Sequence, residues 1–272
     1  MNLSIKQRSF FIFLLFFSLA KADFIIIDSD FFIREIRSKT IWDVGPSNLI
    51  GFYNPTRIVE NLFKAFDLIM PQNPAFPHVY KEGLIMPQII KNWVCNIQSP
   101  EQIRNHVLQE LKKMESVSGI NTKLFQSLTA HILTPSRFAQ ARDCDHDAAK
   151  IIRSIHAAGH TIYYATNQNL ETFNEYKKNG AIKSILDLGA NSLTAGECHL
   201  MKPDHAFYRE AFRKFGITIT PKPQQRVVYI DTEESFINKL KELSIPNIEY
   251  IHCKNYHYKS VAQKLKKLGI YK

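Results

Sequence analysis

Phe24-Ile25-Ile26-Ile27-Asp28-Ser29-Asp30 is the most informative segment of this sequence. Four apolar residues run directly into two carboxylates that are separated by one residue. A short continuous apolar run is typical of a buried strand in a parallel sheet. Ligands of open α/β sheets bind beyond the carboxyl ends of such strands, so Asp28 and Asp30 are candidate site residues. An acidic turn after a strand has the same residue types, and this segment alone leaves both interpretations open.

The amino-terminal 22 residues have the pattern of a secretory signal peptide. Lys6 and Arg8 precede an apolar run over residues 10–20, and Ala20-Lys21-Ala22 offers small residues at a cleavage site. The run is too short to span a bilayer as a helix. We expect cleavage after Ala22 and an exported protein, periplasmic or secreted, with no stable membrane anchor. An uncleaved anchor and a buried N-terminal helix are the alternatives.

Cleavage would leave 250 of the 272 residues, enough for one sizeable core with an inserted subdomain. This part of the chain carries 32 basic residues against 25 acidic ones, a net charge of +7. A basic surface favours anionic partners such as phosphate esters, nucleic acid or anionic lipid. The basic residues are spread out, apart from a mild cluster over residues 259–272, and form no stripe with aromatic residues. We therefore expect no nucleic-acid binding, and the pattern indicates no particular oligomeric state.

The four cysteines lack the CxxC spacing of a zinc site. In an oxidising compartment they can form one or two disulfides. Three connectivities are open for two bridges between Cys95, Cys144, Cys198 and Cys253.

The sequence pattern changes along the chain, from helical periodicity to an alternation of strands and helices. Helical periodicity predicts helices over residues 57–70, 82–96, a segment starting at Ser99-Pro100-Glu101, 122–133 and 145–158. Strands are then expected at 161–165, 184–188, 226–230 and 248–252, alternating with helices at 170–178, 204–215, 233–243 and 260–268. Such alternation is typical of a parallel sheet with helices on both faces. We predict an α/β fold with a Rossmann-like core, residues 23–37 and 157–272, and an inserted α-helical cap, residues 38–156.

The strand ends of this core carry residues that suit phosphoryl transfer: Asp28 and Asp30, Thr166-Asn167, Lys202-Pro203-Asp204, and Asp231. One carboxylate can attack phosphorus and a second can protonate the leaving alkoxide. A hydroxyl or amide can hold a phosphoryl oxygen, and a lysine can neutralise charge. Further carboxylate oxygens would bind Mg²⁺.

In these segments the chain resembles the haloacid dehalogenase-like (HAD) superfamily, especially members with a helical cap after the first motif. Asp28-Ser29-Asp30 matches the DxD motif, Thr166 the residue that closes the second strand, and Lys202-Pro203-Asp204 the K-P-D segment. Val227 to Asp231 matches the hydrophobic strand that ends in an acid. The resemblance covers nearly all of the chain after residue 22.

The resemblance implies a role for each matching residue. Asp28 would be the nucleophile and a Mg²⁺ ligand, and Asp30 the general acid/base, with its backbone carbonyl on the metal. Thr166 and the backbone of Asn167 would bind the phosphoryl group. Lys202 would steady the nucleophile and the phosphate, and Asp231 would hold Mg²⁺. The dehalogenase branch lacks a carboxylate at the Asp30 position, which favours phosphoryl chemistry here.

The chain departs from the family pattern at two motifs. Phe31-Phe32 stands where small residues usually follow DxD, and we expect these rings to serve packing more than substrate stacking. Thr232 replaces a second acid and Phe236 a later Asn, so that Glu233, Glu234 or a water would have to complete the metal site. These departures keep two functions open. The first is a secreted Mg²⁺-dependent phosphatase, and the second is a weak or inactive relative that binds a phosphorylated ligand or a protein.

Nearby clusters have simpler explanations. Asp143-Cys144-Asp145-His146-Asp147 has metal-ligating residue types, but it opens a predicted helix, where acids interact favourably with the dipole. His199, His205 and His252 lie near strand ends or helix starts, and we expect surface or capping roles for them.

Overall fold

A computed structural model describes residues 23–45, 66–67, 69–70, 86–118, 122–218 and 226–271. The predicted signal segment, residues 1–22, lies outside the described residues, and so does most of the helix predicted over 57–70. In the described part of the chain, no helix is long and apolar enough to cross a bilayer. All four cysteines are described, and their thiols are free.

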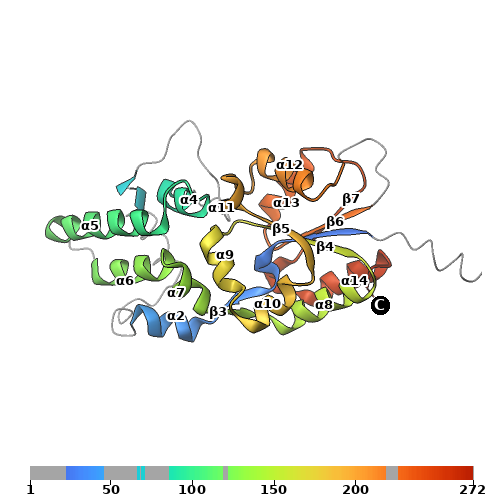
Figure 1. Cartoon of the computed structure of the whole chain (residues 1–272), viewed down its shortest axis with the longest axis horizontal. Coiled ribbons are helices and arrows are strands. Elements are labelled where there is room, and N and C mark those ends of the chain that lie inside the picture. The colour runs from blue at the N-terminus through green and yellow to red at the C-terminus, as the bar shows by residue number, and fades with distance from the viewer. Residues whose placement is uncertain are drawn as a thin grey trace, which may run out of the picture.

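Five parallel strands form the central sheet in the order β5-β4-β1-β6-β7 (Figure 1). Their bounds are β1 Phe24–Ile27, β4 Thr161–Thr166, β5 Gly189–Thr194, β6 Val227–Asp231 and β7 Ile248–His252. The apolar run that predicted the first strand lies in the middle of the sheet. Ile25 pairs with Ile162 on one side and Val228 on the other, and all three are buried. The predicted α/β fold is therefore confirmed.

Alternate residues of the central strands pack against different helices. Ile26 and Tyr229 belong to the cluster that includes α12 (His205–Lys214) and α13 (Glu234–Lys241). Ile25 and Tyr164 belong to the cluster on the other face, with α8 (His146–Ala157), α10 (Gly180–Leu186) and α14 (Tyr258–Lys267). Figure 1 shows these two helical layers above and below the sheet. Helices on both faces bury both sides of the strands, which is why the strands lack alternating polarity.

A helical segment lies beside the sheet, on the left in Figure 1. It consists of α2 (Arg37–Val44), α4 (Gln88–Val94), α5 (Pro100–Ser118), α6 (Thr122–Ile132) and α7 (Pro135–Gln140). The two ends of the segment are joined by an antiparallel pair, β2 (Ile33–Glu35) with β3 (Arg142–Cys144), which the sequence did not predict. The backbone N–H of Asp145 also donates to the Phe32 carbonyl at 2.7 Å. Entry and exit of the segment therefore lie side by side.

Capping residues fix the predicted helix starts. Ser99 Oγ accepts from the Gln102 N–H, and the Gln102 side chain accepts from the Ser99 N–H, both at 3.2 Å. This reciprocal pair is a capping box, and it places the start of α5 where the sequence predicted it. Asp145 accepts from the N–H groups of Asp147 and Ala148 at the start of α8. The acidic cluster over residues 143–147 thus caps a helix, as expected.

Two sequence expectations were wrong. Residues 184–188 form no strand: Asn179 caps a helix, α10, whose apolar residues Ile182, Ile185 and Leu186 are buried at helical spacing. The edge strand β5 follows at Gly189–Thr194, and its polar residues are partly or fully exposed. It therefore lacks the continuous apolar run that predicts a buried strand. The second wrong expectation is the end of the predicted cap at residue 156, which assigned nearly all of α8 to the cap. Its apolar face packs on the sheet instead, so α8 belongs with the core.

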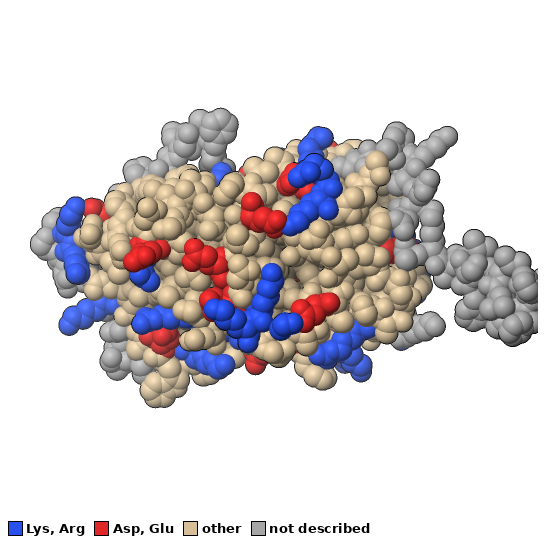
Figure 2. Space-filling view, viewed as in Figure 1, with Lys and Arg blue, Asp and Glu red and all other residues tan. Residues whose placement is uncertain are grey.

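Basic and acidic side chains are interspersed on the face of the molecule shown in Figure 2. Among the described residues, some charges pair within one helix, such as Lys113 with Glu110 and Arg213 with Glu210. The charge on this face is therefore distributed in the same way as along the sequence.

Candidate active site

Four of the predicted site residues meet at the carboxyl edge of the sheet. Asp28 follows β1, Thr166 ends β4 and Asp231 ends β6, while Lys202 comes from the loop before α12. All four side chains are buried, and Asp28 is the most exposed of them at 3%. Parallel strands bring their carboxyl ends to one edge, so residues up to 203 positions apart converge there.

Lys202 bridges two carboxylates. Its Nζ lies 2.9 Å from Asp28 Oδ2 and 2.8 Å from Asp231 Oδ2, and the lysine is completely buried. Burial alone would lower the pKa of Lys202, but Asp231 and Asp28 outweigh it and raise that pKa well above its usual value. Lys202 is therefore a cation that holds one oxygen of the predicted nucleophile.

Asp231 is held by three protein donors. Its Oδ2 accepts from Lys202 and from the Tyr229 hydroxyl at 3.1 Å, and its Oδ1 accepts from the Glu233 N–H at 2.9 Å. Burial raises the pKa of Asp231 to about 7, opposed by the charge of Lys202. Asp231 is thus a positioned counter-charge for Lys202, in addition to its predicted role at the metal.

Asn167 fixes the backbone of Lys202. Its amide nitrogen donates to the Lys202 carbonyl at 2.9 Å, and its amide oxygen accepts from the Lys202 N–H at 2.7 Å. Both ends of the amide are engaged in this pair, so the side chain sets the position of Lys202. The contact with phosphate predicted for the Asn167 backbone is compatible with this role.

Thr166 and Asp30 have neutral partners on the β4 side of the site. Thr166 Oγ1 lies 2.5 Å from Ser29 Oγ. Asp30 is half-buried, and Gln168 donates to its Oδ1 at 3.4 Å. The sequence analysis missed Gln168, because a glutamine two residues after a motif carries no signal of its own.

The loop that carries Gln168 is attached to the end of α4. Asn169 donates to the Trp93 carbonyl at 2.6 Å and to Asn96 Oδ1 at 2.7 Å, and Asn96 Oδ1 also accepts from the Leu170 N–H at 3.0 Å. Gly196 lies against this junction, where a Cβ would come within 2.2 Å of Asn96 Oδ1. The sequence analysis missed this contact between the helical segment and the site loop as well.

The two aromatic residues after the DxD motif serve packing, as expected. Phe31 and Phe32 are both completely buried, with Phe31 edge-on to Tyr258 and Phe32 against Tyr164. They anchor the chain between the nucleophile and the helical segment, and they leave no aromatic face for a substrate.

The oxygen atoms of this site fit Mg²⁺. Asp28 Oδ2 contacts the Lys202 ammonium and Asp231 Oδ1 accepts one hydrogen bond, so each keeps a lone pair for a metal, while Asp28 Oδ1 is buried without a hydrogen-bond partner. The described residues contain no group of three or more His, Cys, Asp or Glu that could hold a metal ion. Mg²⁺ commonly binds to one or two carboxylates and completes its shell with water and substrate phosphate, so two acids suffice.

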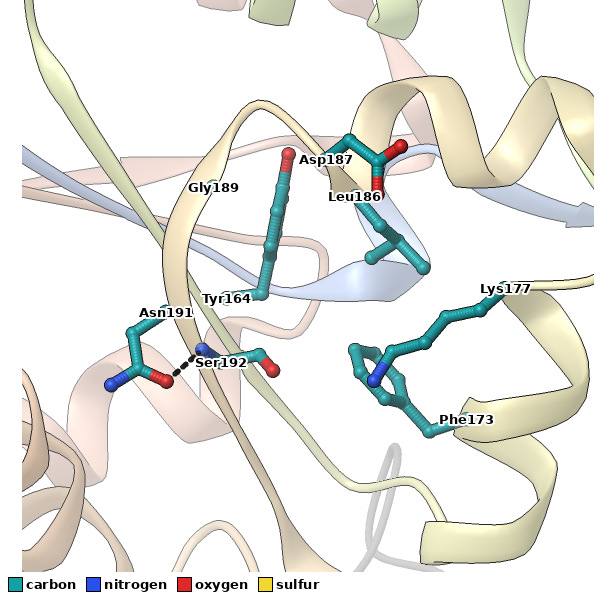
Figure 3. Close-up of a pocket in the computed structure, with 8 residues that line it drawn as sticks. All are labelled: Tyr164, Phe173, Lys177, Leu186, Asp187, Gly189, Asn191 and Ser192. Carbon is teal, nitrogen blue, oxygen red and sulfur yellow. Dashed lines mark hydrogen bonds between the residues drawn. The ribbon is translucent and has the colours of Figure 1, made fainter.

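Two of the hollows that the described residues form lie on the core. One, about 290 Å³, borders the edge strand β5 (Figure 3). The polar groups of three of its residues already have protein partners: Tyr164 donates to the Ile185 carbonyl, Asp187 pairs with Lys183, and Lys177 donates to Asn174. The other hollow, about 540 Å³, begins at Thr232, directly after Asp231. Only the second adjoins the candidate active site.

Comparison with known proteins supports this fold. No protein-family profile matches the sequence, and no curated protein matches it. Among solved structures, a HAD family enzyme from Bacteroides thetaiotaomicron, in complex with magnesium and inorganic phosphate, aligns with a TM-score of 0.52. It is 14% identical, and the alignment covers 86% of this chain and 95% of that one.

Two further structures align over most of their length. A predicted HAD-like family hydrolase from Porphyromonas gingivalis has a TM-score of 0.50 at 12% identity, covering 91% of this chain and 99% of that one. A dehalogenase with an intermediate complex has a TM-score of 0.50 at 11% identity, covering 86% and 85%. The chain therefore has a HAD-like α/β fold, as its motifs predicted.

Proposed function

We propose that this protein is a magnesium-dependent phosphatase that hydrolyses a small phosphate monoester through an aspartyl-phosphate on Asp28. The observation that carries the proposal is the asymmetry of the Asp28 carboxylate. Its Oδ2 lies 2.9 Å from the Lys202 ammonium, while its buried Oδ1 has no partner. One oxygen is held in place and the other is left to attack phosphorus.

The neighbouring residues supply the remaining steps. As Asp28 Oδ1 bonds to phosphorus, the ester bond breaks and Asp30 donates a proton to the leaving alkoxide. Asp30 then takes a proton from the water that attacks the phosphoryl group, which releases phosphate and restores Asp28. The Thr166 hydroxyl and the Asn167 N–H donate to phosphoryl oxygens, and Lys202 offsets the negative charge around Asp28.

Asp28, the Asp30 backbone carbonyl and Asp231 would hold the magnesium ion. When bound, Mg²⁺ supplies positive charge that neutralises the phosphoryl oxygens. The Bacteroides thetaiotaomicron structure in complex with magnesium and inorganic phosphate supports this assignment by analogy of fold.

Asp30 favours phosphatase over dehalogenase chemistry. Dehalogenases also share the fold, but displacement of a halide ion needs no proton donor at the leaving group. An alkoxide leaving group does need one, and the half-buried Asp30 carboxylate follows the nucleophile by two residues. This pairing supports an ester of phosphate as the substrate.

A binding protein without turnover is the second candidate. The hydrogen bonds from Lys202, Tyr229 and Glu233 to Asp231 favour it, because each competes with the metal for a carboxylate oxygen. In that case the site would retain a phosphorylated ligand with little affinity for Mg²⁺.

We also propose that the protein is exported and that residues 1–22 are cleaved off. Asp23, the residue after the expected cleavage site, is already part of the folded core. Its carboxylate pairs with Arg226 at 2.7 and 3.0 Å, and its backbone N–H donates to His160 at 3.2 Å. We expect the processed form, recovered outside the cytoplasm of a secreting host, to begin at Asp23 by mass spectrometry. A chain that retains residues 1–22 would contradict export by cleavage.

Hydrolysis of 4-nitrophenyl phosphate tests the proposed activity. We expect turnover with Mg²⁺, little with a chelator, and a fall of at least about 1,000-fold in kcat for Asp28→Asn. Asp187→Asn, which alters an exposed carboxylate, is the control and should keep the parental rate. Equal rates for Asp28→Asn and the parent would exclude the assigned nucleophile. Absence of turnover together with absence of Mg²⁺ binding by calorimetry would favour the second candidate.

A further inference from the structure

The larger hollow is next to the candidate active site, because its lining begins at the residue after Asp231. It lies between the start of α13 and the loop after β7, which contains the short helix η4 (Lys254–Tyr256). Both segments follow strands at the carboxyl edge of the sheet, where Asp28 and Asp231 also lie. Thr232 joins the two regions, since it follows Asp231 directly and lines the hollow.

Thr232 carries a hydroxyl group that the protein does not satisfy. The residue is 8% exposed, and its Oγ1 has no hydrogen-bond partner in the described structure. A buried hydroxyl without a partner costs about 1–3 kcal/mol, a penalty that a ligand hydroxyl in the hollow would remove. Thr232 also lines a cavity of about 540 Å³, so a group that binds there and can form hydrogen bonds is a candidate partner for this hydroxyl.

The opposite wall is held in an unusual backbone conformation. Asn255 and Tyr256 have φ values of 49° and 57°, a left-handed conformation that is uncommon for residues other than glycine. The Arg34 guanidinium packs 3.1 Å from the centre of the Tyr256 ring, and Tyr258 donates to the Phe31 carbonyl at 3.0 Å. Contacts from the chain that follows the nucleophile thus hold this wall, and the hollow is formed before a ligand arrives.

The lining is polar and of mixed charge. Glu233 and Glu234 lie on the α13 side, with Ser235 and Asn238, and Lys254 and Asn255 face them from the loop. Carboxylates accept hydrogen bonds from hydroxyl groups, and amides both donate and accept. The two glutamates disfavour a second anionic group. The described lining residues include no Val, Leu, Ile, Met or Phe, and the ring of Tyr256, which does line the hollow, already packs against Arg34.

We propose that this hollow receives the alcohol part of the substrate, and that the substrate is the phosphate monoester of an uncharged polyhydroxy alcohol. The inference rests on the proposed phosphatase activity and adds the leaving-group site. The phosphoryl group lies at Asp28, Thr166 and Lys202, and the hydroxyl groups of the alcohol extend past Asp231 toward Thr232 and Asn238. Selectivity then comes from loops of the core, in addition to the helical segment.

The test compares kcat/KM for sorbitol 6-phosphate and 4-nitrophenyl phosphate. We expect the polyol ester to be preferred at least about 10-fold over phosphoethanolamine and over fructose 1,6-bisphosphate, which add a positive and a negative group. Thr232→Val should lower the ratio of polyol to aryl kcat/KM about 10-fold, and Asn238→Ala should lower it in the same direction. Asn174→Ala, an exposed asparagine on α9 (Leu170–Tyr176), should leave the ratio unchanged.

The outcomes distinguish a failure of the leaving-group site from a failure of the proposed phosphatase activity. A valine fills the space of Thr232 and removes an unpaired hydroxyl, so Tm should stay equal or rise, and a lost preference reflects binding. Suppose that the aryl ester is hydrolysed and that this turnover requires Asp28. The leaving-group site alone would then be overturned if the polyol ester is not preferred, or if Thr232→Val leaves the ratio of polyol to aryl kcat/KM unchanged. Preference for phosphoethanolamine would overturn the uncharged alcohol. If no phosphate ester is hydrolysed, the phosphatase proposal fails, and this inference fails with it.

Discussion

The two sides of the Asp28 carboxylate are stabilised by different interactions. Toward β6 lies an ionic side, made of Asp28, Lys202 and Asp231, in which the buried Lys202 ammonium lies 2.9 Å from the Asp28 carboxylate and 2.8 Å from the Asp231 carboxylate. Toward β4 lies a neutral side, in which Thr166, Gln168 and Asn169 make hydrogen bonds to Ser29, Asp30 and Asn96. The ionic side holds the nucleophile, whereas the neutral side positions the acid/base and attaches the helical segment.

This difference predicts different tolerance to substitution. A buried charge that loses its counter-charge keeps its full desolvation penalty. A hydrogen bond between neutral groups, such as that from Asn169 to Asn96, contributes only about 0.5–1.5 kcal/mol, and its loss leaves no buried charge without a partner. Damage to the ionic side should therefore affect stability and turnover together, while damage to the neutral side should affect them separately.

Lys202→Met should have the largest effect. It leaves the Asp28 and Asp231 carboxylates buried without a cation, so we expect a loss of about 3–5 kcal/mol in the free energy of unfolding and no measurable turnover. Urea denaturation with chelator present measures the first quantity. Lys183→Met, which removes an exposed helical pair with Asp187, should change stability by less than about 0.5 kcal/mol.

A double substitution sharpens the comparison. Adding Asp231→Asn to Lys202→Met removes one of the two unpaired carboxylates, so part of the lost stability should return. If the two substitutions were simply additive, the cost would not arise from uncompensated charge, and the ionic side would resemble the neutral one.

Gly196→Ala should damage the neutral side through packing. The added Cβ would lie 2.2 Å from Asn96 Oδ1 and 2.4 Å from the Leu170 nitrogen, where α4 meets the loop after β4. We expect a loss of about 1–3 kcal/mol in the free energy of unfolding. Gly180→Ala is a matched control, because a Cβ there meets nothing within 4 Å, and stability should stay equal or rise slightly. Equal stability of the two variants would mean that the junction between α4 and the loop after β4 accommodates the added Cβ without a loss of stability.

The sequence predicted the ionic side better than the neutral side. Asp28, Lys202 and Asp231 each sit in a segment with its own signal: an apolar run that ends in an acid, or a K-P-D triplet before a helix. Parallel strands then bring these segments to one edge. Asn96 and Asn169 are 73 residues apart on a helix end and a loop, and neither position has a periodicity or motif that links them.

The errors in secondary structure have a similar origin. Ile185 and Leu186 are apolar because α10 covers the sheet, and a short segment with apolar residues does not distinguish a strand from a buried helix. The strand that follows is an edge strand whose exposed positions, such as Ala190 and Asn191, do not need to be apolar. In both cases the position of the segment in the folded protein determined which residue types it needed, and local sequence patterns do not reveal that position.

Gln168→Leu should have the smallest effect and separates catalysis from stability. Its hydrogen bond to Asp30 is long, at 3.4 Å, and half-buried, so we expect a change in unfolding free energy of less than about 1 kcal/mol. The rate should depend on the leaving group: alkyl phosphates, whose alkoxide needs a proton from Asp30, should lose more kcat than 4-nitrophenyl phosphate, whose phenolate leaves without one. A several-fold loss for the alkyl ester with little loss for the aryl ester would show that Gln168 orients the acid. Gln263→Leu, on the exposed face of α14, should change neither rate. Equal losses for both esters would instead mean that Gln168 supports the site only as packing, and the neutral side would then have no part in proton transfer.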